Sequence, residues 1–90
     1  MESITLKVSA KSNPKSVAGS IVNNIREGKT VDIVAMGANA VNQTVKAIAI
    51  AGEYAQPEGY DVLCRPGFTH LEIEGETRSA VKISVIAGKK

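Results

Sequence analysis

Two strand-like segments in the first half of the chain each lead directly into a helix-like segment. In residues 3–9, Ile4, Leu6 and Val8 alternate with polar residues, which is typical of a strand with one buried face. Residues 30–36, TVDIVAM, are apolar at most positions, which predicts a central strand. Each strand–helix–strand connection is long enough to join parallel neighbours, so the pattern predicts an α/β chain with a partly parallel sheet.

The first helix is predicted between Asn13 and Gly28. Asn13 suits the N-cap position, and Pro14 suits the first helical position, where the missing N–H costs nothing. Gly28 stands where a glycine commonly ends a helix. Apolar residues recur at every fourth position and give the helix one buried stripe, formed by Val17, Ile21 and Ile25.

The second helix is predicted to follow a turn at Gly37, with Asn39 as its cap, and to end near Tyr54. Its apolar residues do not keep to one stripe. One face holds Val41, Val45, Ile48 and Ala49, and much of the rest holds Ala40, Ala47, Ile50 and Ala51. A helix with apolar residues on several sides needs cover on several sides. We therefore expect a homodimer or homotetramer, an expectation that depends most on Ala40, Ala47 and Ile50.

The last third of the chain predicts two antiparallel strands. Residues 60–65 read as a strand that is broken by Pro66 and Gly67. Residues 68–74 and 78–86 alternate around a glycine turn, and the basic tail AGKK is expected to fray. The predicted fold is a two-layer α/β (α+β) sandwich in the order β-α-β-α-β-β, with a mixed sheet and both helices on one face.

Length and composition favour one small soluble domain over residues 1–90. The chain is 43% hydrophobic and 22% charged, with a formal net charge of +2. It has no apolar run of about 18 residues and no signal-peptide pattern, so no membrane association is expected. A single cysteine excludes an intrachain disulfide, which favours the cytoplasm.

Enzyme chemistry is not expected. Cys64 and His70 are the one conceivable nucleophile–base pair, but a lone strand cysteine is usually a small buried hydrophobe, and His70 reads as a surface residue. No Ser-His-Asp signature, phosphate loop or Cys/His metal cluster is present in the sequence. We therefore expect no catalytic residue, no metal, no cofactor and no small-molecule substrate.

Lys11 and Lys15 are unusual because they flank the start of the first helix. A helix N-terminus carries partial positive charge, so cations there are unfavourable by a few tenths of a kcal/mol. The alternative to a function is that both side chains extend into water. A phosphate bound by the two lysines and by free backbone N–H groups would explain their position. Aromatic residues make up only 3% of the chain, too few for a base-stacking platform, so nucleic acid would be held by its backbone.

Three stretches carry a resemblance to a known family. They are LKVSAKSNPKSVAGSIVNNIREG, AMGANAVNQTVKAIAIA, and DVLCRPGFT with IEGETRSAVKISV. Together they closely resemble the stage V sporulation protein S family of bacteria over nearly the whole chain. That family is similar to the wider Alba superfamily of small dimeric chromatin and RNA-binding proteins. The resemblance implies a β-α-β-α-β-β fold, a homodimer or higher assembly, nucleic-acid binding through the first loop, and a role in sporulation.

Two departures from the Alba pattern bear on function. Alba proteins usually carry an arginine after the glycine that opens the second helix, where this chain has Ala38 and Asn39. Their last hairpin is long and basic, whereas IEGETRS is expected to be short and holds two glutamates beside Arg78. The first hypothesis is a nucleic-acid-binding regulatory or architectural protein, on DNA or RNA, and the alternative is a protein-interaction or assembly module. The expected contacts are Lys11, Lys15, Asn39, Asn42, Gln43, Lys46 and Arg78.

Overall fold

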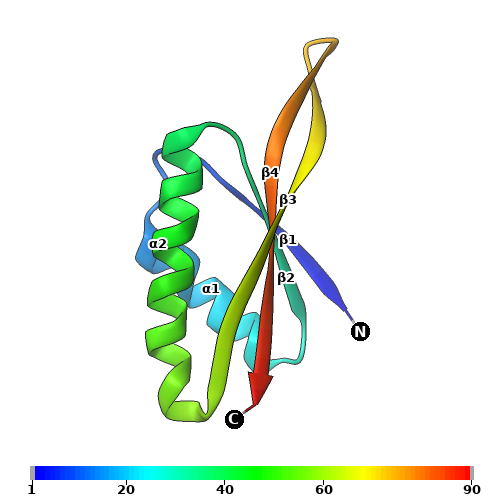
Figure 1. Cartoon of the computed structure of the whole chain (residues 1–90). Helices are drawn as coiled ribbons and strands as arrows, with labels where there is room; N and C mark the ends of the chain where they lie inside the picture. Colours follow the sequence, from blue (N-terminus) through cyan, green and yellow to red (C-terminus); the bar gives the residue numbers. More distant parts are fainter. Residues whose placement is uncertain (1, 90) are drawn as a thin grey trace.

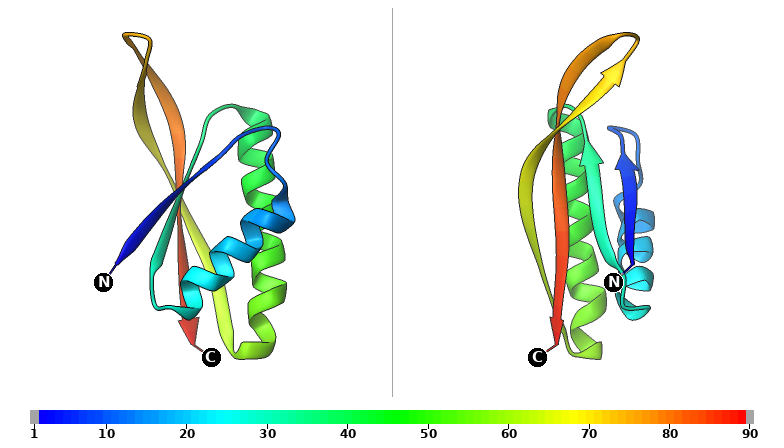
Figure 2. Two further views of the ribbon diagram at one scale, coloured as in Figure 1. Left: turned by 180° about the vertical axis from the view of Figure 1, so that it is seen from behind. Right: turned by 90° about the vertical axis from the view of Figure 1, so that its right-hand side faces the viewer.

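The computed structural model describes residues 2–89 and has the predicted β-α-β-α-β-β order (Figure 1). Both helices cover one face of a four-stranded sheet, and the other face has no helix over it (Figure 2). The predicted fold class is therefore confirmed. The elements are β1 (Ser3–Val8), α1 (Pro14–Arg26), β2 (Thr30–Ala35), α2 (Ala38–Ala55), the 3-10 turn η1 (Gln56–Glu58), β3 (Tyr60–Ile73) and β4 (Glu76–Lys89).

The strand order in the sheet is β1-β2-β4-β3. β1 and β2 are parallel, from Ser3 opposite Thr30 to Val8 opposite Ala35. β4 pairs antiparallel with both β2 and β3, so β2 is interior as predicted. The second crossover does not join parallel neighbours, because β4 lies between β2 and β3.

The core lies between the helices and the two central strands. Alternate residues of β2, among them Val31 and Ile33, face the helices, and Ile83 and Val85 of β4 lie directly opposite them. Ile21 of α1 is fully buried against this layer. The remaining buried residues of α1 are Ala18, Val22, Asn24 and Ile25.

The local signals for α1 are confirmed, but the cap predicted for α2 is wrong. Asn13 caps α1, Pro14 is its first residue, and Gly28 follows its end with a φ of 75°. α2 begins at Ala38 after Gly37, which has a φ of 90° and offers no side-chain cap. Asn39 is the second helical residue, since Gly37 takes the cap position and the helix starts two residues earlier than a cap at Asn39 would give.

α2 packs within the chain through its small residues. Ala40, Ala47 and Ala51 are at most 2% exposed, so the prediction that Ala40 and Ala47 face another subunit is wrong. Small side chains allow a helix to lie close to its neighbours, which is why the chain covers them itself. Ile50 is half-buried and packs against the core, whereas Val45 is 54% exposed. The apolar residue that α2 leaves exposed is therefore Val45, whereas Ala40 and Ala47 were predicted to lie on the uncovered side.

β3 and β4 are 14 residues each and form one continuous hairpin, so the predictions of a broken strand and a short hairpin are wrong. Pro66 and Gly67 lie inside β3, which is an edge strand and tolerates a residue without an N–H. The tail does not fray over 87–89, because Lys89 pairs with Tyr60, and Lys90 lies outside the described residues.

The distal part of the hairpin projects beyond the helix layer, and we call residues 67–79 the arm (Figure 1). Glu74 and Gly75 form its turn with φ values of 52° and 80°, as a two-residue type I′ turn requires. Cys64 is exposed rather than buried, because the edge strand β3 runs beyond the cover that the helices provide. His70 is exposed, as expected.

An ion pair joins the end of α1 to η1. Arg26 Nε donates to Glu58 Oε1 at 2.8 Å and to Oε2 at 3.0 Å, and Arg26 Nη2 also donates to Oε2. The hydrogen bond from Arg26, together with its charge, lowers the pKa of the Glu58 carboxyl below its ordinary value of 4.5. A carboxyl whose pKa is lowered by folding stabilises the fold above its unfolded pKa and loses that contribution as the pH falls through the folded pKa.

Glu58→Gln should therefore destabilise the protein slightly at neutral pH and progressively less below about pH 4.5, until the two chains unfold alike. Urea unfolding of both chains along an acid pH series measures the difference. Glu53→Gln is the control, because Glu53 forms no ion pair with the described residues. A difference between Glu58→Gln and the wild type that did not change with pH would contradict the assignment.

Candidate nucleic-acid interface

A pocket of about 700 Å³ lies where the β1–α1 loop and the first turn of α1 meet the middle of α2. We call it the lysine pocket. Three stretches that are distant in sequence contribute to it, since the loop, α1 and α2 are brought together by the packing of the two helices. Its lining residues are Lys11, Ser12, Asn13, Pro14, Lys15, Gln43, Lys46, Ala49 and Ile50.

Hydrogen bonds hold the loop against α2. Gln43 Nε2 donates to the Ser12 carbonyl oxygen at 2.9 Å and so ties the loop to the helix. Within the loop, the Ser9 N–H donates to Ser12 Oγ at 2.9 Å, and the Lys11 N–H donates to Ser9 Oγ at 3.2 Å. The backbone that carries Lys11 is therefore positioned before any ligand binds.

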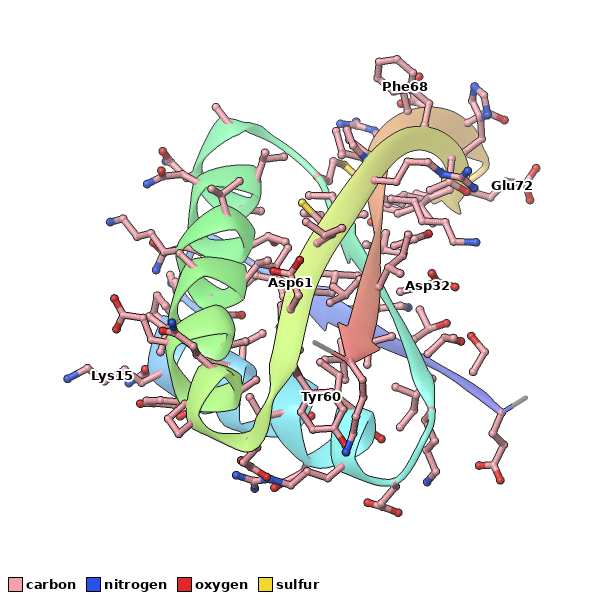
Figure 3. All side chains as sticks on the ribbon, turned by 60° about the horizontal axis from the view of Figure 1, so that its bottom comes forward. Lys15, Asp32, Tyr60, Asp61, Phe68 and Glu72 are labelled. Atoms are coloured by element: carbon pink, nitrogen blue, oxygen red, sulfur yellow. The ribbon has the colours of Figure 1, made fainter. Side chains whose placement is uncertain are left out.

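Lys11, Lys15 and Lys46 give the pocket its charge. None of the three forms an ion pair with the described residues, and no acidic residue lines the pocket. Figure 3 shows Lys15 extending away from the helix layer into solvent. Three lysines that form no ion pair with residues 2–89 therefore line one pocket, which is an arrangement that an anionic ligand would neutralise.

The helix N-terminus itself does not supply free donors. Asn13 Oδ1 accepts from the N–H groups of Lys15, at 2.9 Å, and Ser16, at 3.3 Å. The Val17 N–H donates to the Asn13 carbonyl, and Pro14 has no N–H. The expectation that backbone N–H groups of α1 would hold a phosphate is therefore wrong, because the asparagine cap already satisfies them. A phosphate would be held by the lysine side chains.

The structure brings together four of the seven predicted contact residues: Lys11, Lys15, Gln43 and Lys46 line the same pocket. Asn39 and Asn42 are exposed and lie one helical turn before Gln43 and Lys46, so they continue the same side of α2 outside the pocket.

Arg78 is not part of the pocket. It lies on the arm opposite Leu71, and its Nη2 is 3.3 Å from Glu76 Oε2. Figure 3 places Phe68 and Glu72 of the same arm away from Lys15.

The apolar wall of the pocket was not predicted. It consists of Pro14, Ala49 and Ile50, and Ile50 was instead expected to face another subunit. The helical spacing indicates that Ile50 lies beside the polar residues of the pocket. It follows Gln43 by seven residues and Lys46 by four, which places it on the same side of the helix.

Cys64 and His70 do not form a catalytic pair. They lie six residues apart on the same strand, which corresponds to about 20 Å. Within residues 2–89, no three His, Cys, Asp or Glu side chains are grouped so that they could hold a metal ion. No helix in this part of the chain is long and apolar enough to cross a membrane.

Comparison with known proteins gives a family and a fold. A family model described as Stage V sporulation protein S (SpoVS) matches residues 4–88. Among solved structures, the chain is similar to Alba from Thermoplasma volcanium, with a TM-score of 0.63 and 15% sequence identity. The match covers 96% of this chain and 100% of the Alba chain. At this identity the likeness concerns the fold.

Lys15→Glu should raise the free energy of unfolding by roughly 0.3–1 kcal/mol, because a negative side chain replaces a positive one at the N-terminus of α1. The first turn of α1 holds no acidic residue in the wild type, so no carboxylate there already interacts with the helix dipole. Urea unfolding at low ionic strength measures it. Lys7→Glu on the exposed side of β1 makes the same charge change away from any helix end. Equal effects of the two substitutions would contradict the helix-terminus explanation.

Proposed function

Since the chain belongs to the stage V sporulation protein S family, which implies a role in sporulation, we propose that it acts there as a nucleic-acid-binding protein without catalytic activity. Its task would be regulatory or architectural, on DNA or RNA. The observation that carries the proposal is the lysine pocket, where Lys11, Lys15 and Lys46 meet without an acidic partner among the described residues.

Phosphate contacts explain why three lysines are gathered there. Ammonium groups that neutralise phosphates release counterions from the nucleic acid, and this term supplies most of the affinity of sequence-independent binding. Lys15 is unfavourable for the helix that carries it, and a bound phosphate compensates for that position. Asn39 and Asn42 extend the surface along α2 and offer side-chain amides to the same backbone.

The arm does not favour the same role. Glu72, Glu74 and Glu76 surround its turn, and Arg78 is engaged with Glu76. Carboxylates at the tip of a projecting hairpin repel phosphates, so insertion of the arm into a nucleic-acid groove is disfavoured. We therefore assign the contact surface to the lysine pocket and its continuation on α2, and leave Arg78 outside it.

We further propose a homodimer, in which a second copy covers the exposed apolar surface between α2 and β3. Its exposed apolar residues are Val45 on α2 and Cys64, Pro66 and Phe68 on β3, and we call this surface the α2–β3 flank. The three β3 residues lie opposite Val85, Ile83 and Val81 of β4, so they share the side of the sheet that faces the helices. Phe68 is 82% exposed and Val45 54%. Burying one such side chain contributes about 1.5–3 kcal/mol. A small chain that leaves these side chains uncovered gains most from a self-complementary contact with its own copy.

A protein-interaction module is the alternative function, and the same flank favours it. A different partner protein seated on Val45 and Phe68 would bury the same apolar surface. In that case the lysines would contribute surface charge alone, and nucleic acid would not bind even at low salt.

Replacing Lys11, Lys15 and Lys46 together by Gln should weaken nucleic-acid binding and flatten its salt dependence. On duplex DNA, the slope of log affinity against log salt should fall by about 0.9 for each lost phosphate contact. Titration of a labelled duplex at several salt concentrations measures both slopes.

The matched control replaces Lys7, Arg65 and Lys82 by Gln, which makes the same change in net charge on the sheet face that has no helix over it. Lys7 and Lys82 are exposed there, and Arg65 lies opposite Ser84. Equal slopes for the two triple variants, or a wild type that fails to bind at low salt, would contradict the proposal.

The combined variant Val45→Lys and Phe68→Ser should halve the mass in solution, since it places a charge and a polar group in the proposed dimer contact. Light scattering at micromolar concentration measures the mass. Leu63→Lys is the control, because Leu63 is 59% exposed on the opposite sheet face. The dimer proposal fails if the wild type is already monomeric, or if the flank variant keeps the wild-type mass.

A further inference from the structure

We infer that the lysine pocket receives a whole unstacked nucleotide, with its base or sugar against the apolar wall and its phosphate on the lysines. The inference rests on the proposed function for the charged half of the pocket and goes beyond it for the other half. Backbone binding alone needs cations on a surface and has no use for the concave apolar part.

The size of the pocket supports a ligand larger than a phosphate. Its volume of about 700 Å³ lies within the range of roughly 300–1,000 Å³ that is typical of small-molecule sites, and the pocket is broadly open to solvent, so a ligand could enter as part of a longer strand. Such sites are mostly apolar, with a few polar groups that fix the orientation of the ligand. The lysine pocket is richer in polar residues, but it combines both kinds of lining, since Pro14, Ala49 and Ile50 stand beside three lysines and two side-chain amides.

The two halves of the pocket adjoin each other on α2. Lys46 and Ile50 are four residues apart on α2, so their Cβ atoms are about 5–6 Å apart. The flexible Lys46 side chain can therefore reach the phosphate of a nucleotide whose base or sugar lies on Ile50. Ile50 packs against the core, which keeps the apolar wall in place while the lysine side chains adjust. A phosphate alone would leave this wall in contact with water.

The polar groups between the two halves suit a base or a sugar. Gln43 uses Nε2 for the Ser12 carbonyl and keeps Oε1 as an acceptor. Asn13 uses Oδ1 to cap α1 and keeps the two N–H donors of Nδ2. One acceptor and one donor group therefore line the pocket without weakening the structure that positions them.

A duplex cannot fill this pocket, because its bases are paired and stacked inside the helix. Single strands, loops and ends can turn a base outward, and a free nucleotide has no stack to leave. The pocket should therefore favour unstacked nucleotides over a blunt duplex. A strand and a free nucleotide share this chemistry, and the competition described below separates them.

Ile50→Gln tests the apolar wall, because it leaves all three lysines in place and conserves the net charge. Binding is measured by fluorescence anisotropy with a labelled single strand and with a blunt duplex of the same sequence, each at several salt concentrations. The wild type should bind the single strand more tightly. Ile50→Gln should weaken single-strand binding at least fivefold, as expected when the burial of an isoleucine side chain against a base or sugar is lost, and leave duplex affinity and both salt slopes unchanged.

Two further variants keep the test decisive. Ala49→Leu fills the pocket from an exposed position, so it tests the same wall even if Ile50→Gln destabilises the fold. Leu63→Gln removes a similar apolar side chain from the opposite sheet face and should change neither affinity. Competition by a nucleoside monophosphate at millimolar concentration would identify a free nucleotide as a ligand, and single-strand preference without competition would identify a strand.

The outcomes distinguish this inference from the proposed function. If the wall variants weaken duplex and single-strand binding equally, or weaken neither, while the triple lysine variant still loses binding, the inference is wrong and backbone binding stands. If the triple lysine variant binds as well as the wild type, the proposed function fails and the nucleotide site fails with it.

Discussion

The close packing of α2 through its small residues determines where every other surface of the molecule lies. Ala40, Ala47 and Ala51 are buried, and Thr44 is fully buried with its hydroxyl satisfied by donating to the Ala40 carbonyl at 2.9 Å. With this side fixed against the core, the helical period directs Gln43 and Lys46 toward the β1–α1 loop. The same period leaves Val45 beside β3, so one packing choice creates both the lysine pocket and the exposed apolar flank.

Local signals predicted local structure well. Asn13, Pro14 and Gly28 define α1 through interactions within a few residues, and the structure contains all three as predicted. The errors concern positions that depend on which strand lies at an edge. Pro66 appeared to break a strand and Cys64 appeared buried, because strand order is a tertiary property that alternation does not encode. The observed order β1-β2-β4-β3 makes β3 an edge strand, which tolerates the proline and leaves the cysteine exposed.

The features of the candidate site also fall into two groups: those that local sequence signals predict and those that depend on how the chain packs. Lys11 and Lys15 could be identified from the sequence because they oppose the dipole of the helix that follows them. The backbone donors expected beside them are occupied by the Asn13 side chain, which the predicted N-cap at Asn13 already implied. The apolar wall was assigned to a subunit contact, since the sequence showed that Ile50 was apolar but not that the loop would face it. Tertiary packing therefore changed the expected ligand chemistry while the charged residues stayed the same.

The position of Pro66 in the edge strand also limits how copies of this chain associate. An exposed edge of 14 residues offers a template to which a strand of another molecule could add, and such addition continues without end in fibres. Pro66 has no N–H, so a continuous ladder along β3 is interrupted near its middle. The long hairpin can therefore expose its β3 edge without offering an uninterrupted template for strand addition along it.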